Sequence, residues 1–543
     1  MSGAVVTRGP GHTVGRLLGL VANALSGTGT RYKAAAVAPH RSISTTTTGL
    51  PPLTHLPMTH SDIIVIGGGL SGLSAARKLH EAGKTVTVLE ARDRVGGKTW
   101  SVRTKAGGNV ELGAAWINEH TQPTITRLAE EAGNRYFEQN VDGSAIVYHS
   151  RSGERALFPG ATVNELDPKD PLYTLKTQLQ ALSDSVDLAD VSRTPNAQEL
   201  DELSAYTWFR EAGATPQQIH EDLEPIVGTI WGGTAREISF LYLLHYVKTC
   251  GGWVSLISDN HKGGQYQRTR NGNQSMSLYL ASLLPEGTVR LEHPVSSVTR
   301  TRDIVVVGTR SGASFTADAV ILALPTPLYS NIRFEPQLPL LQRQAVERSF
   351  VGYYCKVILV YDRPWWYEAG YSGSSFLPDG HVAITLDSSD GIYARGLDAR
   401  GMAPRQYSLT CFVTDQRGLK WSQLPKAERH AAVIAEVGAA FQRPQDAAHP
   451  VEIFELEWIN QEWSRGAPVA LYPPGQFLLL AQASGAPTDR LFFAGTENSP
   501  SWKGYMEGAV IAGRNAAGQA IEWLNGPGRK GKLRRGEVVA GKL

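Results

Sequence analysis

The chain has 543 residues, of which 42% are hydrophobic, enough to bury one large core or two medium ones. Its 53 lysines and arginines nearly balance its 51 aspartates and glutamates, which gives no electrostatic argument for a nucleic-acid partner. No apolar run reaches the roughly 18 residues of a membrane-spanning helix. Three widely spaced cysteines predict neither a disulfide framework nor a metal site and favour an intracellular protein.

The first 61 residues contain no aspartate or glutamate but carry arginine and lysine in a Ser/Thr-rich background. Within them, residues 13–25 have the pattern of a short amphipathic helix. A basic, hydroxyl-rich, acid-free leader is typical of mitochondrial transit peptides. A disordered extension, or a start at Met58, explains the same residues, so residues 1–60 are interpreted as a disordered or targeting leader.

A nucleotide-binding pattern follows, in DIIVIGGGLSGLSAARKLHEAGKTVTVLEARDRVGGKT from residue 62. The apolar run 63–66 predicts a buried parallel strand. Gly67, Gly69 and Gly72 then allow a tight turn, close approach of backbone to a pyrophosphate, and close packing of helix on strand. A second strand over 85–89 ends in Glu90, about 20 residues past the glycines, where a carboxylate accepts hydrogen bonds from ribose hydroxyls. The pattern predicts a dinucleotide site for NAD or FAD.

The next two segments favour a flavin. ARDRVGGKT, residues 91–99, resembles the R-x-G-G-[RK] segment that flavoprotein oxidases place after the ribose-binding acid. Its small residues let the backbone pass beneath the diphosphate, and its basic residues neutralise that anion. VELGAAWI, residues 110–117, resembles the [ED]-L-G-[GA] stretch that runs along a flavin ring.

The middle of the chain alternates helical and strand patterns. Residues 226–252 have helical apolar spacing, and we expect Trp231 and Tyr242 to line a pocket, whereas His245 is more typical of a core histidine. The stretch after residue 293 predicts a hairpin, and AVILALP at 319–325 predicts a strand that ends at a proline.

Lys356 lies in VGYYCKVILVY, an apolar and β-branched run that predicts a buried strand. A lysine there is costly unless it has a partner or a task. Near the far end, LFFAGTENSPSWKGYMEGAVIA at 491–512 predicts a strand and then a helix. A helix N-terminus aimed at a flavin pyrimidine ring would stabilise the negative charge that reduction places there.

Seven blocks in order resemble the flavin monoamine oxidase family: IGGGLSGL, LEARDRVGGK, ELGAAW, LEHPV, LALP, FAGTE and GYMEGAV. The resemblance covers residues 62–525. It implies an α/β fold with a discontinuous Rossmann-type FAD-binding domain (61–116, 264–330 and 486–525) and an α+β substrate-binding domain (117–263 and 331–485). Residues 526–543 would form a basic tail.

The resemblance implies the residues that contact FAD. They are Gly67, Gly69, Leu70, Ser71, Gly72, Glu90, Ala91, Arg92, Gly97, Lys98, Thr99, Gly113, Ala114, Ala115, Trp116, Val295, Gly495, Glu497, Gly504, Tyr505 and Met506.

The resemblance also implies catalytic residues. The family places a lysine in the strand of Lys356, bridged by water to flavin N5. Tyr505 matches one of two aromatic rings that face each other across the substrate, and Trp458 matches a tryptophan near the flavin. Because an ammonium cannot release hydride from its α-carbon, the pocket must favour the neutral amine, and burial between aromatic faces does so.

Two positions depart from the family pattern. Ala467 stands where animal monoamine oxidases carry the cysteine bonded to FAD, so we expect non-covalent FAD. Pro468 stands where the second aromatic ring is expected. Either the aromatic cage has only one ring, or Trp463 or Tyr472 supplies the second ring from another position. We therefore expect Trp463 and Pro468 at the substrate pocket, and a substrate wider than a small aromatic monoamine.

The function implied is FAD-dependent oxidation of an amine to an imine, with O2 reduced to hydrogen peroxide. A flavin desaturase, an L-amino-acid oxidase and a polyamine oxidase remain alternatives. An amino-acid oxidase would need an arginine to pair with the substrate carboxylate. The acid Glu119 is compatible with a polyamine substrate. A non-catalytic flavoprotein that acts through partners is disfavoured, because the sequence shows no added interaction domain. The sequence leaves open whether the protein is a homodimer. It also leaves open its location, which is the mitochondrion, the cytoplasm or, from the terminal Gly-Lys-Leu, the peroxisome.

Overall fold

The computed structural model describes residues 60–159, 167–393 and 403–526. All of the expected leader except His60, and all of the basic tail except Gly526, lie outside these residues. In the part of the chain that is described, no helix is long and apolar enough to cross a membrane.

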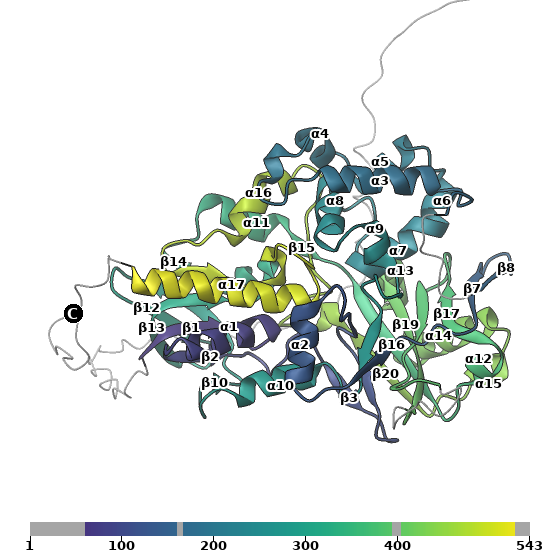
Figure 1. Cartoon of the computed structure of the whole chain (residues 1–543), viewed down its shortest axis with the longest axis horizontal. Helices are drawn as coiled ribbons and strands as arrows, with labels where there is room; N and C mark the ends of the chain where they lie inside the picture. Colours follow the sequence, from purple (N-terminus) through teal and green to yellow (C-terminus); the bar gives the residue numbers. More distant parts are fainter. Residues whose placement is uncertain (1–59, 160–166, 394–402, 527–543) are drawn as a thin grey trace, which may run out of the picture. The chain divides into compact units, whose positions relative to one another are not determined.

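An eight-stranded sheet gathers strands from both ends and the middle of the chain (Figure 1). Its order is β10-β2-β1-β13-β12-β11-β14, and β22 pairs with the end of β13. The pairs among β10, β2, β1, β13 and β22 are parallel, whereas β12 runs antiparallel to β11 and β13. The strands are β1 (His60–Ile66), β2 (Val86–Leu89), β10 (Val289–Arg290), β11 (Val295–Arg300), β12 (Val305–Thr309), β13 (Ser314–Leu322), β14 (Arg333–Glu335) and β22 (Leu491–Phe493).

The continuous apolar run of β1 reflects burial on both faces of this sheet. Ile63 and Val65 pack into one core cluster, and Ile64 and Ile66 pack into another on the opposite face. Alternate side chains of a strand point to opposite faces, so a central strand covered on both sides needs apolar residues throughout. The predicted buried parallel strand is confirmed.

Two helices from opposite ends of the chain pack together over this sheet. α1 (Leu70–Glu81) and α17 (Met506–Asn525) lie side by side in Figure 1, and both contribute to the same core cluster. A Cβ built on Gly513 of α17 would lie 2.1 Å from the Ser71 carbonyl oxygen, so only glycine permits this approach. α2 (Pro123–Glu131) and α10 (Gln274–Ser282) pack into the same cluster.

A second, seven-stranded sheet has the order β20-β16-β19-β18-β17-β7-β8. On β16, Cys355, Val357 and Leu359 face a core cluster with α12 and α14, whereas Tyr354 and Ile358 face the opposite cluster. Lys356 lies in register with the latter face. The strands are β7 (Ser144–Tyr148), β8 (Arg155–Pro159), β16 (Tyr354–Tyr361), β17 (Tyr371–Phe376), β18 (Ile384–Asp387), β19 (Tyr407–Thr414) and β20 (Glu452–Glu457).

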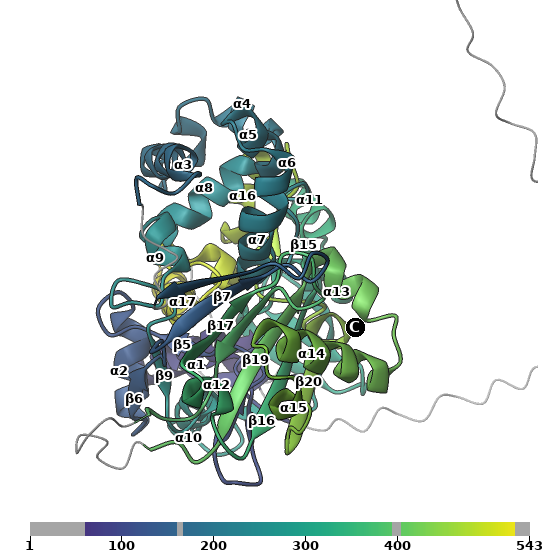
Figure 2. The ribbon, with the colours of Figure 1, turned by 90° about the vertical axis from the view of Figure 1, so that its right-hand side faces the viewer.

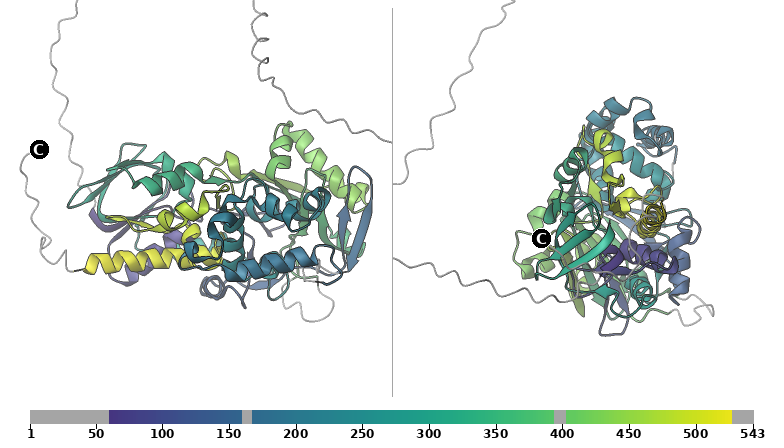
Figure 3. Two further views of the ribbon diagram at one scale, coloured as in Figure 1. Left: turned by 90° about the horizontal axis from the view of Figure 1, so that it is seen from above. Right: turned by 90° about the vertical axis from the view of Figure 1, so that its left-hand side faces the viewer.

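Helices gather above this second sheet in Figure 2, and Figure 3 includes a view of the molecule from above. All of them except α6 (Pro216–Gln218) contribute to one core cluster. They are α3 (Tyr173–Ser185), α4 (Ala197–Glu202), α5 (Ala205–Glu211), α6 (Pro216–Gln218), α7 (Glu224–Trp231), α8 (Phe240–Thr249), α9 (Trp253–Ile257) and α16 (Phe477–Gly485). The remaining helices are α11 (Leu340–Arg348), α12 (Trp365–Glu368), α13 (Asp415–Trp421), α14 (Lys426–Ala440) and α15 (Pro444–Ala447).

Three small sheets complete the strand pairing: β3 with β4, β15 with β21, and β5-β9-β6. Their strands are β3 (Ser101–Arg103), β4 (Asn109–Glu111), β5 (Trp116–Ile117), β6 (Tyr136–Glu138), β9 (Gln267–Thr269), β15 (Phe350–Val351) and β21 (Ala470–Leu471).

The strands of the two large sheets come from different parts of the chain. Those of the eight-stranded sheet fall within 61–116, 264–330 and 486–525, except for β14 and the first residue of β1. Those of the seven-stranded sheet all fall within 117–263 and 331–485. On this basis we propose that the chain forms two domains, each built from separate parts of the sequence.

Candidate active site

A first cavity lies at the carboxyl ends of parallel strands. Its lining includes Gly67 after β1, Glu90 after β2, Ala323 after β13 and Gly495 after β22. Ligands of open α/β sheets bind outside the carboxyl ends of the strands. The position of this cavity therefore follows from the fold.

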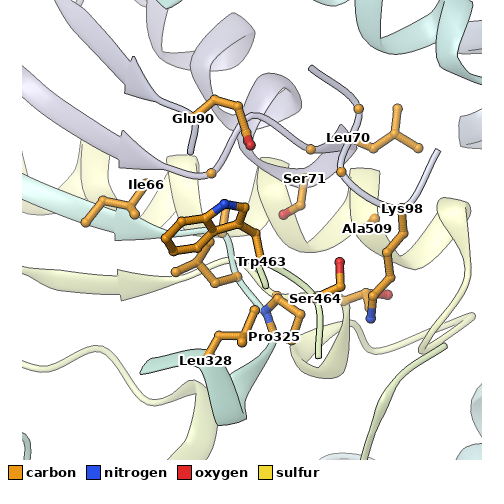
Figure 4. Close-up of a pocket in the computed structure, with 18 of the residues that line it drawn as sticks. Ile66, Leu70, Ser71, Glu90, Lys98, Pro325, Leu328, Trp463, Ser464 and Ala509 are labelled. Carbon is orange, nitrogen blue, oxygen red and sulfur yellow. The ribbon is translucent and has the colours of Figure 1, made fainter. Parts of the chain in front are cut away.

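The glycine turn after β1 has no room for side chains. Gly67 has φ +107°, and a Cβ there would lie 2.6 Å from the Ala323 carbonyl oxygen. A Cβ on Gly72 would lie 1.9 Å from the Gly67 carbonyl oxygen. The first amides of α1, like those of any helix, have no intrahelical partner. Gly69, which precedes α1, supplies no side chain to cap them. Leu70 and Ser71, at this N-terminus, line the cavity, as Figure 4 shows.

Glu90 is held at the cavity wall by backbone amides. The Gly68 N–H donates to its Oε2 at 2.6 Å, and the Arg92 N–H donates to its Oε1 at 2.9 Å. Arg92 in turn donates from Nη2 to Ser464 Oγ at 2.8 Å, and burial lowers its pKa. The carboxylate points into the cavity in Figure 4 and keeps lone pairs for hydroxyl donors.

Lys98 brings a half-buried ammonium to the same cavity. Its Nζ donates to the Pro468 carbonyl oxygen at 2.8 Å. Burial lowers its pKa to about 8, opposed by the nearby Glu497 carboxylate, whose own pKa burial raises. Together with Arg92, Lys98 gives this cavity positive charge for an anion such as a diphosphate.

A second, mostly apolar and aromatic cavity adjoins the first. Residues of β5, α7, β16 and the N-terminus of α17 line it. Six residues line both cavities: Lys98, Ala114, Pro468, Gly504, Tyr505 and Met506. The two cavities therefore meet at this set, which we call the junction.

Lys356 lies beside the junction on the cavity face of β16. Its Nζ donates to the Gly113 carbonyl oxygen at 2.5 Å and to the Glu111 carbonyl oxygen at 3.3 Å. The ammonium also lies 5.5 Å from the centroid of the Trp116 ring and 5.3 Å from that of Phe412. Burial lowers the pKa of Lys356 to about 7, and the Glu111 carboxylate opposes this shift.

The other two expected catalytic residues also line the second cavity. Trp458 donates from Nε1 to the Leu112 carbonyl oxygen at 2.9 Å, which fixes its ring beside the ELGAAW segment. The Tyr505 hydroxyl accepts a hydrogen bond from Gln265 Nε2 at 3.4 Å, and its ring packs edge-on against Trp502 at 5.0 Å.

The structure brings most expected cofactor residues to the two cavities. The first cavity is lined by Gly67, Gly69, Leu70, Ser71, Glu90, Ala91, Arg92, Gly97, Lys98, Thr99, Ala114, Val295, Gly495, Glu497, Gly504, Tyr505 and Met506. Gly113, Ala115 and Trp116 line the second cavity. Gly72 lines neither, because it packs α1 against the turn.

Fewer of the residues expected at the substrate pocket line the second cavity. Trp231 and Tyr242 line neither cavity; Trp231 packs edge-on on Tyr246, and the Tyr242 hydroxyl donates to the Ala470 carbonyl oxygen at 2.8 Å. Because α8 is buried almost all round, helical spacing could not distinguish its cavity face from its core face. Pro468 lies at the junction.

Trp463 lines the first cavity rather than the second, and Figure 4 shows its ring there. The Arg310 guanidinium lies 4.4 Å from the centroid of that ring. Tyr472 lines neither cavity and packs on Tyr242 and Phe477. Neither residue therefore completes an aromatic cage in the second cavity.

Sequence reasoning missed several residues of the second cavity, including Tyr246, Tyr354, Asp259 and Gln265. Two of them had a signal. Tyr246 follows Tyr242 by four positions on one helix, and Tyr354 precedes Lys356 by two positions on one strand, so each shares a face with a candidate. The other two lie in a loop, where no periodicity marks the buried residues.

Ala467 lines the second cavity. The three cysteines, Cys250, Cys355 and Cys411, are free and buried, and none lines either cavity. Within the described part of the chain, no thiol is therefore in reach of a ligand at the junction.

Comparisons with known proteins agree with this geometry. The family model for flavin containing amine oxidoreductase matches residues 70–521. The chain is 32% identical over 474 residues to amine oxidase [flavin-containing] B of Homo sapiens, covering 85% of this chain and 86% of that protein. It is 32% identical over 462 residues to an amine oxidase [flavin-containing] of Oncorhynchus mykiss, covering 85% of each.

Solved structures give the same result. Putrescine oxidase, in a structure described as wild type bound to putrescine, has a TM-score of 0.77 at 27% identity, covering 86% of this chain and 100% of that one. Cyclohexylamine oxidase from Brevibacterium oxydans IH-35A has a TM-score of 0.76 at 31% identity, covering 86% and 99%.

Fold and site thus define a flavoprotein oxidoreductase. The chain belongs to the flavin-containing amine oxidoreductase family, and it is an FAD-dependent enzyme that oxidises amines. The first cavity fits that cofactor on its own features. It offers the uncapped N-termini of α1 and α17, a glycine turn without room for a Cβ, and the Glu90 carboxylate.

Proposed function

We propose that the enzyme holds FAD non-covalently in the first cavity and oxidises an uncharged amine bound in the second. FAD, when bound, would supply the acceptor for a hydride from the carbon next to nitrogen and would pass the electrons to O2, which is reduced to hydrogen peroxide. Water then hydrolyses the imine product to an aldehyde or ketone and ammonia or an amine. The observation that carries this proposal is the junction, where residues from both ends of the chain line both cavities.

The walls of the second cavity favour the neutral form of the amine. Tyr505, Tyr246 and Tyr354 contribute aromatic surface, and Ile226 and Ile230 of α7 contribute aliphatic surface. Transfer of an ammonium from water into such surroundings costs free energy, which lowers its pKa. We propose that this desolvation supplies the uncharged amine without a dedicated base.

We assign Lys356 Nζ a proton-handling role beside the junction. A lysine with a pKa near 7 exchanges a proton readily at neutral pH, whereas an exposed lysine stays protonated. Two backbone carbonyl oxygens orient the ammonium, so its position does not depend on a flexible partner. Trp458 supports the same segment, because it donates to the Leu112 carbonyl oxygen between the two carbonyls that Lys356 contacts.

The N-terminus of α17 would complete the electrostatics. Tyr505 precedes the helix without capping it, and Met506, its first residue, lies at the junction. The free amides of this turn favour developing negative charge. Glu507 does not cancel the effect at the junction, because its carboxylate accepts from the N–H groups of Thr124 and Ile125 and so caps α2.

An amino-acid oxidase is disfavoured by the composition of the second cavity. Among the described residues, no arginine lines it, so a substrate carboxylate would lack a bidentate partner. Glu119, which kept a polyamine open, lines neither cavity and accepts hydrogen bonds from Gln267 and Tyr136.

The test is peroxide production by the purified holoenzyme across monoamines, diamines, polyamines and amino acids. We expect peroxide with at least one amine and none with amino acids. A flavin-loaded enzyme that is reduced by none of these amines would overturn the proposal. Two further proposals are measured separately: a homodimer by the mass of the protein in solution, and a mitochondrial destination, which rests on the leader alone, by the location of the full chain.

A further inference from the structure

The second cavity carries an acid whose charge nothing in the reaction above uses. Its lining holds two basic side chains, Lys98 and Lys356, and one acidic side chain, Asp259. Lys98 belongs to the junction and Lys356 lies beside it, and both donate to backbone carbonyl oxygens. Asp259 lies in the loop between α9 and β9, a different segment of the chain from those that carry the two lysines.

The loop that carries Asp259 is held tightly by its own backbone. The Gly263 N–H donates to the Asn260 carbonyl oxygen at 2.8 Å, and the Gln265 N–H donates to the Ser258 carbonyl oxygen at 3.1 Å. A Cβ on Gly263 would lie 1.9 Å from that same Ser258 oxygen, so the loop closes only with glycine there. These contacts fix the backbone around Asp259, whose half-buried side chain lines the cavity.

Gln265 relates this loop to the junction. Its Nε2 donates to the Tyr505 hydroxyl at 3.4 Å and to the Leu256 carbonyl oxygen at 3.2 Å. Since Tyr505 lies at the junction and the Gln265 N–H donates to the carbonyl oxygen of Ser258, the residue before Asp259, the loop forms cavity wall next to Tyr505. A substrate with its reacting nitrogen at the junction would extend along this wall.

Asp259 has no cation to balance it. Burial raises the pKa of its carboxyl to about 7, and the hydrogen bond that opposes this shift comes from its own backbone. No lysine, arginine or histidine of the described residues contributes to the balance. Asp259 is half-buried. A carboxylate partly removed from water without a partner is costly, and a ligand cation that pairs with it recovers part of that cost.

Two further polar groups of the cavity are unsatisfied. Gln265 Oε1 and Thr229 Oγ1 are buried and have no hydrogen-bond partner within the described part of the chain. Both residues line the second cavity. Buried polar atoms are nearly always paired, so these oxygens indicate a donor that arrives with the ligand. An ammonium offers three N–H donors and no acceptor, which matches a carboxylate and an amide oxygen.

We propose that Asp259, with Gln265 and Thr229, forms a subsite for a second cationic nitrogen, and that the preferred substrates are diamines or longer amines that carry one. The reacting amine lies neutral at the junction while the second nitrogen stays protonated at Asp259. The proposal rests on the proposed function, because it needs amine oxidation in the same cavity. It also gives the enzyme a means of choosing substrates that differ in charge but not in size.

The experiment compares cadaverine with hexylamine, which differ by a terminal ammonium in place of a methyl group. For the wild-type holoenzyme we expect kcat/KM to favour cadaverine. Asp259→Asn keeps the side-chain shape and removes the charge, so it should lower kcat/KM for cadaverine by about 10- to 100-fold, the range of a hydrogen bond to a charged group. It should change hexylamine turnover by less than about threefold.

Glu119→Gln is the matched control, because Glu119 is an acid of a neighbouring segment that lines neither cavity. It should leave the preference unchanged. Equal loss for both amines in Asp259→Asn, or a wild type that turns over both equally, would overturn the subsite. A shift in the pH profile for hexylamine would do so as well, since it would make Asp259 a proton acceptor for any amine.

The wild-type enzyme gives a second readout if Asp259→Asn does not retain flavin. Across α,ω-diamines of increasing length, kcat/KM should pass through a maximum set by the fixed separation of junction and subsite. Alkyl monoamines of the same lengths should show no maximum at that length. Parallel trends in the two series would contradict the proposal. Absence of peroxide with every amine would instead refute the proposed function and leave no role for the subsite.

Discussion

The Lys356 ammonium donates a 2.5 Å hydrogen bond to the carbonyl oxygen of Gly113, a residue 243 positions earlier in the chain. Gly113 cannot be larger, because a Cβ there would lie 1.8 Å from the Lys98 carbonyl oxygen and 3.3 Å from the Trp458 ring. This contact joins the seven-stranded sheet to the segment that borders both cavities. The lysine and the backbone of Gly113 are therefore positioned by one another.

The first prediction concerns the role of this lysine. Lys356→Met keeps an unbranched side chain of similar length but removes the ammonium. We expect FAD content to remain and oxygen-dependent turnover to fall by about 100-fold or more, the contribution typical of a positioned proton-transfer group. Stopped-flow reduction and reoxidation of the bound flavin would show which half-reaction slows.

Lys78→Met serves as the control for this prediction. Lys78 also donates from Nζ to a backbone carbonyl oxygen, that of Arg514 at 2.9 Å, but it lines neither cavity. Turnover in this variant should match the wild type. Unchanged turnover in Lys356→Met would remove Lys356 from the catalytic residues.

The second prediction follows from the pKa of Lys356. Its ordinary value is 10.5, and burial lowers it to about 7 in the folded protein. Between these values the unfolded chain binds a proton that the folded protein does not, so the stability contributed by this group rises with pH. Below about pH 7 both states are protonated and the dependence disappears.

We therefore expect wild-type stability to gain on Lys356→Met as pH rises from about 7 towards 10.5, by at most about 1.4 kcal/mol per pH unit. The measurement is the difference in the free energy of unfolding between the two proteins in matched buffers. A constant difference across this window would mean that Lys356 stays protonated in the folded enzyme.

The third prediction concerns attachment of the cofactor. Ala467 lines the second cavity, and none of the cysteines at 250, 355 and 411 lines either cavity. No thiolate is therefore available to bond the flavin. Acid precipitation of the purified enzyme should leave yellow FAD in the supernatant and a colourless pellet, measured by absorbance. A yellow pellet would show a covalent link and contradict this prediction.

Sequence patterns predicted the first cavity better than the second, for a physical reason. Gly67, Gly72 and Glu90 are fixed by local geometry that one short βαβ unit contains, so their spacing is visible in the sequence. Lys356 was visible because a lysine within an apolar strand is costly. The backbone N–H groups that hold Glu90 belong to the same local unit, and the structure has them.

Apart from Lys356, the second cavity has no signal as strong as that of the first. Its walls come from β5, α7, β16 and loops that only the tertiary fold brings together. Tyr242 and Tyr246 lie on one helix that is buried almost all round, and which of them borders a cavity depends on neighbouring helices. Asp259 lies in a loop whose course is set by backbone hydrogen bonds and a glycine contact, which no apolar periodicity reveals.

The last prediction tests how closely the two ends of the chain must pack. A Cβ on Gly513 would lie 2.1 Å from the Ser71 carbonyl oxygen, so Gly513→Ala must separate α17 from α1. Overpacking of this kind costs about 1–3 kcal/mol of stability. Because Ser71 lines the first cavity and α17 begins at the junction, the same displacement should also weaken FAD binding.

Gly518 of the same helix is the matched control for Gly513. A Cβ there would meet only Lys78 Nζ, the end of a flexible side chain, at 3.2 Å. Gly518→Ala should therefore be neutral or stabilise the protein by up to about 1 kcal/mol, the helix propensity of alanine over glycine. Thermal unfolding and FAD release by ultrafiltration measure both variants. If Gly513→Ala kept FAD and stability as well as Gly518→Ala does, the junction would not depend on close packing of α1 and α17.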